Sequence, residues 1–221
     1  MDAHIVQLLL DSFTQLLIPG ILVTIPLTLI SFAIGMAIAL VASLVRHARI
    51  PVLRNLVRIY VWIFRGTPLL VQLFVVFFGL PSLGVVIDPF PAAVITFSLN
   101  VGAYASEILR SAINAVPRGQ FEAGYCVGMS YLAIMKRIVF PQALRTAFPP
   151  LFNEFISLAK STSLASSITV YEMFMSAQRI AARTYEPFWL YVEAALLYLI
   201  FSTLLTQLQL WGERRLKKYD F

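Results

Sequence analysis

One uncharged run constrains the fold of this chain more than any other feature of its sequence. It extends from Ser12 to Val45 without an Asp, Glu, Lys or Arg residue. As a helix with a rise of about 1.5 Å per residue, this run is far longer than the roughly 30 Å hydrocarbon core of a bilayer. Charged residues make up 13% of the chain, about half of the roughly 25% that is typical of soluble domains. The sequence therefore predicts a membrane protein.

Further apolar runs predict an all-α integral membrane protein with five transmembrane helices. Pro19 and Gly20 interrupt the first run, so we expect a short interfacial segment over residues 5–17 before the first complete span. The fourth span is less apolar than the others and contains Glu154 and Lys160. One transmembrane domain is expected over residues 1–221, with spans at about 22–45, 58–80, 91–113, 150–170 and 188–211.

The distribution of lysine and arginine predicts the orientation, because positively charged loops stay in the cytoplasm. Apart from Lys160 within a span, only Arg179 and Arg183 fall on the expected outer side. The other 14 of the 17 basic residues gather on the opposite side: Arg46, Arg49, Arg54, Arg58, Arg65, Arg110, Arg118, Lys136, Arg137, Arg145, Arg214, Arg215, Lys217 and Lys218. We therefore expect the N-terminus outside and the C-terminus in the cytoplasm. The formal charge of +6 then indicates contact with anionic inner-leaflet lipid, and nucleic acid is not expected as a partner.

Sequence motifs for catalysis and metal binding are missing from the chain. It has no G-x-x-x-x-G-K-[ST] phosphate loop, no H-E-x-x-H pair and no G-x-S-x-G elbow. With only His4, His47 and Cys126 as histidine and cysteine residues, a zinc cluster is implausible. We expect no enzyme activity, no metal and no cofactor in this chain, so any nucleotide would be bound by another protein.

The loop between the third and fourth spans, residues 117–141, is predicted to form two short helices joined at a glycine. Ser130 is a plausible N-cap for the second helix, and Gly128 can adopt the positive φ of a sharp turn. Apolar residues recur in the second half at i, i+3, i+4 and i+7: Tyr131, Ile134, Met135 and Ile138. This apolar face either rests on the membrane surface or binds in a groove of a soluble partner.

Polar residues form a stripe on one face of the fourth span, where lipid could not solvate them. They lie at i, i+4, i+7 and i+8: Asn153, Ser157, Lys160 and Ser161, with Glu154 beside the first of them. Glu154 and Lys160 point about 120° apart and lie roughly 9 Å apart along the helix. Two interpretations remain open, a pathway that meets both ends of a zwitterionic substrate and a structural seam with other helices.

The third span carries a second pair of charges near its inner end. Glu107 and Arg110 are three residues apart, so their side chains can pair on one face of the helix. We expect this ion pair to be structural.

The loop over residues 117–141 resembles the "EAA" loop of ATP-binding-cassette (ABC) importer permeases. Glu122 and Ala123 precede Gly128 as in that motif, while Gly124 replaces its second alanine and Phe140 stands where leucine is usual. Other segments resemble the polar amino acid subfamily: Phe64 to Gln72, Ala103 and Tyr104 with Glu107 and Arg110, Pro141 to Ala143 with Arg145, Pro149 and Pro150 with Asn153, and Lys160 with Thr162 to Leu164.

The resemblance implies the type I importer permease fold in a bacterial inner membrane. It implies a polar amino acid substrate, with cystine as the first guess from overall likeness, delivered from outside by a solute-binding protein. A second permease subunit, identical or related, would complete the pathway, and two ATPase subunits would bind ATP and Mg²⁺. The loop residues implied to contact the ATPase are Glu122, Ala123, Gly124, Gly128, Met129 and Ser130.

Two other classes of function remain as alternatives. One is a secondary amino acid transporter driven by an ion gradient, and the other is a membrane scaffold without transport. An odd number of spans and the lack of an internal repeat weigh against the first, and a scaffold would not need the polar stripe of the fourth span.

Overall fold

The computed structural model describes residues 3–47 and 51–217, and this part of the chain is helical with no strand. Its long helices are α2 (Ile25–His47), α5 (Pro89–Asn114), α8 (Phe140–Ser161) and α10 (Pro187–Lys217). Its shorter helices are α1 (Ala3–Pro19), α3 (Pro51–Gly66), α4 (Leu69–Phe74), α6 (Arg118–Cys126), α7 (Tyr131–Ile134) and α9 (Met173–Thr184). Five short π- or 3₁₀-helical turns connect some of them: η1 (Gly20–Thr24), η2 (Val75–Gly79), η3 (Leu80–Leu83), η4 (Met135–Val139) and η5 (Thr162–Ile168).

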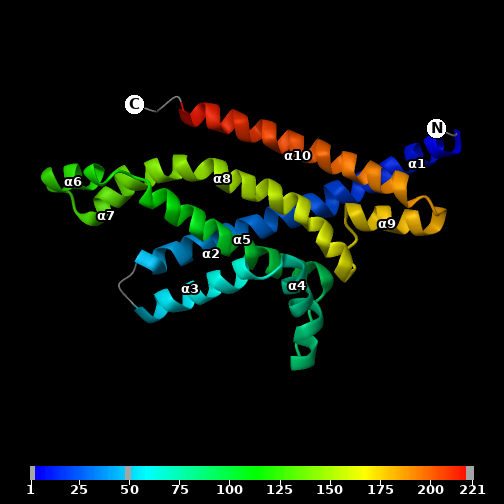
Figure 1. Cartoon of the computed structure of the whole chain (residues 1–221), viewed down its shortest axis with the longest axis horizontal. Coiled ribbons are helices and arrows are strands. Elements are labelled where there is room, and N and C mark those ends of the chain that lie inside the picture. The colour runs from blue at the N-terminus through cyan, green and yellow to red at the C-terminus, as the bar shows by residue number, and fades with distance from the viewer. Residues whose placement is uncertain (1–2, 48–50, 218–221) are drawn as a thin grey trace.

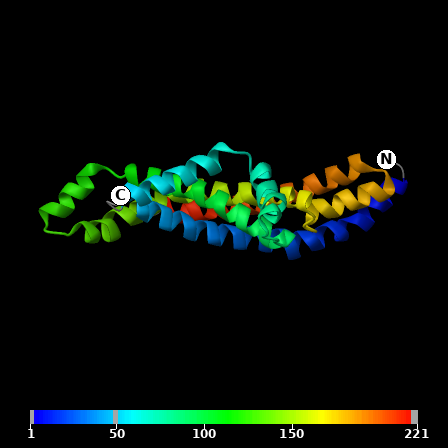
Figure 2. The ribbon, with the colours of Figure 1, turned by 90° about the horizontal axis from the view of Figure 1, so that it is seen from below.

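The molecule is elongated, and its two ends differ (Figures 1 and 2). The α6–α7 hairpin forms one end, and the last turns of α10 lie on that side. The start of α1 lies at the other end, close to α9. The long helices run along the axis that joins the two ends, so the shape fits a bundle that crosses a membrane.

α1, η1 and α2 form one continuous helix, which differs from the separate interfacial segment expected over residues 5–17. Pro19 keeps a helical backbone, with φ −60° and ψ −31°. Proline has no N–H for the carbonyl oxygen of Gln15, and the Ser176 hydroxyl donates a hydrogen bond of 2.8 Å to that oxygen instead. Gly20 lies so close to Met173 and Phe201 that an added Cβ would be 3.2 Å from each side chain. The interruption at Pro19 and Gly20 is therefore a packing contact, and the chain does not turn there.

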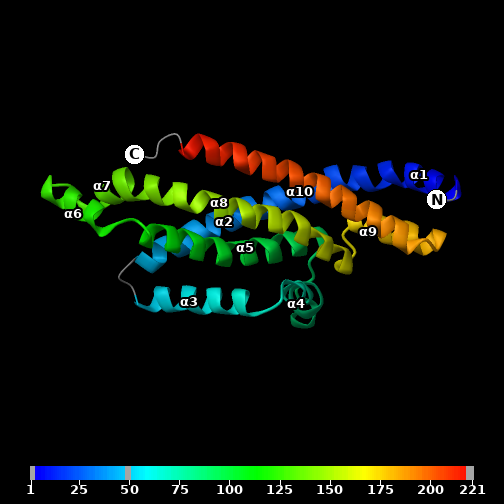
Figure 3. The same cartoon turned by 45° about the horizontal axis from the view of Figure 1, so that its top comes forward.

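The second apolar segment is broken, where the sequence indicated one continuous span over residues 58–80. α3 and the segment from Leu69 to Leu83 meet at 109°. This second segment (the crosswise arm) projects sideways from the bundle in Figure 1 and is seen nearly along its axis in Figure 3. Pro68 has an extended backbone, with ψ 138°, and it has no N–H to continue a helix. The Gln72 amide donates hydrogen bonds to the carbonyl oxygens of Phe64 (2.8 Å) and Thr67 (3.0 Å), which satisfies backbone groups that the break leaves without a helical partner.

Three helices of the described residues are long and apolar enough to cross a membrane, or four if the bent pair counts as one span. α8 is not among them, and it carries Arg145, Glu154 and Lys160. It begins at Phe140 and ends at Ser161, earlier at both ends than the expected span over 150–170. The count of five spans stays a prediction.

α5 is the centre of the bundle and packs against α2 and α8. Small residues allow the close approach of α2 and α5, since a Cβ at Gly35 would lie 2.7 Å from Val101 and one at Gly102 would lie 2.7 Å from Ile38. The fully buried Phe97 belongs to the core around α5. A second, smaller core joins α1, α9 and α10. The first core holds α5 and α8 together, and these helices carry the polar groups described next.

Candidate functional site

The α6–α7 hairpin has the turn that the sequence predicted. Gly128 has a φ of 76°, and the backbone N–H of Met129 donates a hydrogen bond of 3.0 Å to the carbonyl oxygen of Gly124. The predicted N-cap is also confirmed, because the N–H of Ala133 donates to the Ser130 hydroxyl at 3.4 Å. The hairpin is therefore a compact unit at the end of the molecule.

Gly124, which departs from the loop motif, lies inside this hairpin. It is buried, and a Cβ in its place would lie 2.6 Å from Cγ1 of the fully buried Ile134. Glu122 and Ala123 lie on the exposed side of α6. The departure at Gly124 therefore affects the packing of α6 on α7 and leaves the exposed surface unchanged.

The apolar stripe of the loop packs mainly against the protein's own core, an outcome that neither earlier interpretation included. Ile134 is buried in the core, and Met135 and Ile138 are partly buried against it. Tyr131 of the stripe is 48% exposed, but the most exposed apolar residues of the hairpin are Val127 (76% exposed) and Leu132 (77% exposed). Sequence reasoning missed both, although each is an apolar residue outside the helical stripe and close to the turn glycine.

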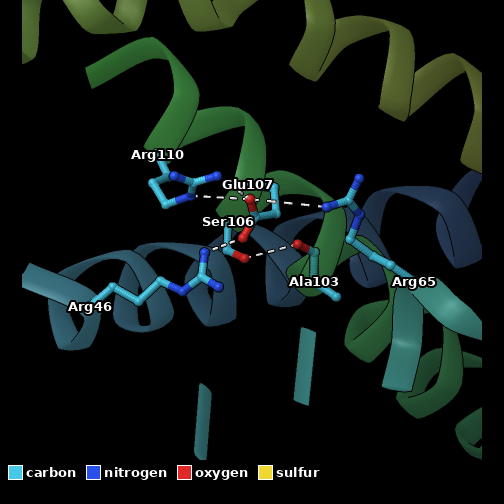
Figure 4. A network of polar contacts seen from close by, with 6 residues as sticks. All are labelled: Arg46, Arg65, Ala103, Ser106, Glu107 and Arg110. Atoms are coloured by element: carbon cyan, nitrogen blue, oxygen red, sulfur yellow. Dashed lines mark hydrogen bonds and ion pairs between the residues drawn. The ribbon is translucent and has the colours of Figure 1, made fainter. Parts of the chain in front are cut away.

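Glu107 of α5 holds together charged residues from three helices (Figure 4). The Arg110 guanidinium donates hydrogen bonds of 2.8 and 3.1 Å to Oε2 of Glu107, so the expected pair is present. Arg46 of α2 donates to Oε1 of the same carboxylate. Arg65 of α3 lies 4.0 Å from Oε2, and its guanidinium lies 5.4 Å from the centre of the Tyr104 ring.

A cavity of about 310 Å³ lies where the break after α3 meets α5 and α8. It is lined by Thr67, Pro68, Leu69, Asn100, Val101, Tyr104, Glu154, Ser157, Leu158 and Ser161. Three of the five residues predicted for a substrate pathway, Glu154, Ser157 and Ser161, therefore share one cavity. The Glu154 carboxylate has no hydrogen bond or ion pair with any of the described residues, so the cavity holds a carboxylate that none of these residues neutralises.

The other two predicted pathway residues lie outside this cavity. Lys160 lines a separate groove of about 480 Å³, whose wall is almost entirely apolar and comes from η1, α2, α8 and α10. Asn153 lines neither space and is exposed. The polar stripe on α8 is therefore divided between two sides of the helix.

Sequence reasoning missed Thr67, Asn100 and Tyr104 as cavity residues. Asn100 donates a hydrogen bond of 3.0 Å to the Gln72 side chain, which in turn donates to the Thr67 hydroxyl at 2.9 Å. The available signal was the Gly-Thr-Pro sequence inside an apolar run, since interrupted membrane helices commonly form binding sites. Among residues 3–47 and 51–217, no three His, Cys, Asp or Glu side chains are placed to hold a metal ion.

The chain is similar to several known proteins over nearly its whole length. Residues 35–218 match the model of the family described as binding-protein-dependent transport system inner membrane component. The L-cystine transport system permease protein TcyB of Bacillus subtilis is 51% identical, over 96% of this chain and 92% of that protein. The probable amino-acid ABC transporter permease protein PatM of Vibrio harveyi is 41% identical, over 83% and 86%. A crystal structure of an amino acid ABC transporter with histidines superimposes with a TM-score of 0.91 and 32% identity, over 97% of this chain and 100% of that one.

Proposed function

We propose that this chain carries L-cystine, on the basis of the family to which it belongs. It is a member of the binding-protein-dependent transport system inner membrane component family. Within that family it is a permease subunit of the amino-acid ABC transporter class, with the type I importer fold. The observation that carries the proposal is the 51% identity to a cystine permease over 96% of the chain. The chain is a multi-pass membrane protein. In our proposal it lies in a bacterial inner membrane with its N-terminus outside, because 14 of its 17 basic residues would then face the cytoplasm.

The proposed substrate pathway passes through the cavity beside the break after α3. Its volume of about 310 Å³ is at the lower end of the range of roughly 300–1,000 Å³ for small-molecule sites. Glu154 supplies a carboxylate for a substrate ammonium group, and Ser157 and Ser161 supply hydroxyls that can accept or donate hydrogen bonds. Lys160 has no place in this pathway, because it lines the separate apolar groove, and Asn153 is left out because it is exposed and lines neither space.

Transport in this account is driven by two ATPase subunits that bind ATP and Mg²⁺ and contact the α6–α7 hairpin. The contact surface consists of the exposed Glu122 and Ala123, the turn at Gly128 and Ser130, and the exposed Leu132. Apolar side chains exposed at the tip of a compact hairpin suit insertion into a groove of a soluble partner. Gly124 and Met129 act from inside the hairpin, where one is buried and the other half-buried.

A second permease subunit, a copy of this chain or a related one, completes the transporter in our proposal, and a solute-binding protein docks on the outer side. The crosswise arm supports the pairing, because it exposes Val71, Phe74 and Phe78 away from the bundle. A two-fold pair with the same surface on both subunits is the commonest solution for such a seam.

Competition for uptake tests the proposed substrate. The permease, its ATPase and its solute-binding protein are reconstituted in proteoliposomes, and uptake of radiolabelled L-cystine is measured against unlabelled L-cystine, L-arginine or L-glutamine. We expect L-cystine to be the strongest competitor. If radiolabelled L-cystine is not taken up, and radiolabelled L-arginine or L-glutamine is, the family assignment stands and the substrate proposal is wrong.

A further inference from the structure

The cluster around Glu107 contains more positive charge than its one carboxylate can neutralise. Arg46, Arg65 and Arg110 all face Glu107, and no other carboxylate pairs with any of them among residues 3–47 and 51–217. Such an excess of positive charge in a membrane protein favours a further anion. Arg65 and Arg110, with side chains 46% and 44% exposed, are accessible to one.

Arg65 is held least firmly of the three arginines. Its closest approach to the carboxylate is 4.0 Å, which is too long for a hydrogen bond. Arg46 and Arg110 already donate hydrogen bonds to the two oxygens of Glu107. The Arg65 side chain is 46% exposed, against 15% for Arg46. Arg65 is therefore the arginine that can turn toward another anion without breaking the cluster.

The position of Arg65 connects this cluster to the polar cavity. It lies in the last turn of α3, directly before the break whose residue Thr67 lines the cavity. Tyr104, over whose ring its guanidinium lies, also lines the cavity. Glu154 comes to the same cavity from α8, on another helix of its wall. Arg65 does not itself line the cavity, but it lies beside two residues that do, Thr67 and Tyr104. A zwitterion in the cavity would therefore meet a carboxylate from α8 and would have the Arg65 guanidinium next to the cavity wall.

We propose that Arg65, supported by the Tyr104 ring, receives the carboxylate of the transported amino acid while Glu154 receives its ammonium group. The inference rests on the proposed function, since it assigns the substrate's second charged group within the same cavity. A guanidinium suits this role because it can bind a carboxylate with two parallel hydrogen bonds. It also replaces Lys160 as the cation of the pathway, because Lys160 lines the separate apolar groove.

Binding to the purified complex of permease and ATPase, without the solute-binding protein, tests the assignment. Two pairs of probes are used, each an amino acid with its decarboxylated analogue: L-cystine with cystamine, and L-arginine with agmatine. The readout is the ratio of the two affinities within the pair that the wild-type complex binds. A change that only weakens the fold lowers both affinities together and leaves this ratio unchanged.

In Arg65→Gln we expect the affinity for the amino acid, relative to that for its decarboxylated analogue, to fall on the order of 10- to 100-fold. This is the loss in affinity expected when a hydrogen bond to a charged group is removed. Arg65→Lys keeps the charge without the two-pronged geometry, so the ratio should fall by a smaller factor. Arg58→Gln, which removes an exposed arginine from the same helix, is the matched control and should keep the wild-type ratio.

An unchanged ratio in both Arg65 variants would overturn the inference and leave Arg65 as a structural member of the Glu107 cluster. If Arg65→Gln does not assemble, the ratio in Arg65→Lys alone decides in the same way. A wild-type complex that binds L-arginine and not L-cystine would refute the proposed substrate, while the L-arginine pair would still test Arg65. Binding of neither amino acid would refute both proposals.

Discussion

Replacing Gly124 by alanine tests whether the α6–α7 hairpin works as one packed unit. The added Cβ would lie 2.6 Å from Cγ1 and 2.8 Å from Cδ1 of Ile134, whereas carbon atoms in contact normally lie about 3.5–4.0 Å apart. Ile134 is fully buried, so it cannot move aside without disturbing its neighbours. Overpacking of this kind costs about 1–3 kcal/mol, and the higher helix propensity of alanine returns up to about 1 kcal/mol.

Gly119→Ala is the matched control for this prediction. Gly119 lies in the same helix, and no atom lies within 4 Å of a Cβ added there. The control therefore gains helix propensity without a steric clash, so the difference between the two variants isolates the clash at about 1–3 kcal/mol.

Hydrogen exchange measured by mass spectrometry reports the local stability of the hairpin. We expect amides of α7 and η4 to exchange on the order of 5- to 150-fold faster in Gly124→Ala than in Gly119→Ala. Less ATPase should copurify with Gly124→Ala than with Gly119→Ala. The double variant Gly124→Ala with Ile134→Val should recover part of the protection, because valine lacks the terminal Cδ1. Equal exchange in both single variants would refute the packing argument.

Three further predictions follow from single residues. Gly128→Val should cost about 1–3 kcal/mol from backbone strain alone, because φ is 76° and no atom lies within 4 Å of the added Cβ; normal transport with the ATPase bound would contradict a role in coupling. An impermeant thiol reagent added outside should leave Cys126 of the wild-type protein unlabelled. In the double variant Cys126→Ser with Tyr185→Cys, it should label the new cysteine, at a position where Tyr185 is 86% exposed; the reverse pattern would contradict the proposed topology. Gln72→Leu should lower the melting temperature of the complex, because the carbonyl oxygen of Thr67 loses a donor and Asn100 keeps only its 3.4 Å hydrogen bond to the carbonyl oxygen of Phe64, at about 1–3 kcal/mol for a buried group left without a partner; an unchanged melting temperature would show that these hydrogen bonds do not stabilise the break.

The sequence was informative where a residue has one physical use in its local setting. Gly128 and Ser130 have such uses, a positive φ and a helix cap, and both are confirmed. Glu107 and Arg110 meet on one helix face because they are three residues apart. Local geometry alone was enough for these features.

Neighbouring helices decided the features that sequence reasoning missed. The helical periodicity of α8 predicts on which face of the helix Lys160 lies. It does not predict which helices pack beside that face, and in the structure they form an apolar groove. Arg65 lies 42 residues before Glu107 in the sequence, so their proximity depends on how α3 packs against α5. The break at Pro68 carried a local signal, but the surrounding uncharged run made one continuous span an equally good interpretation.

The driving force of transport tests the central claim most directly. Proteoliposomes contain the permease, its ATPase and its solute-binding protein. Radiolabelled L-cystine is added on the side of the membrane where the solute-binding protein docks. The initial rate of uptake is compared under two conditions, ATP on the ATPase side without an ion gradient and an imposed sodium or proton gradient without ATP. The account predicts uptake with ATP alone and none with either gradient alone. Uptake that follows an ion gradient without ATP would contradict it and favour a secondary transporter.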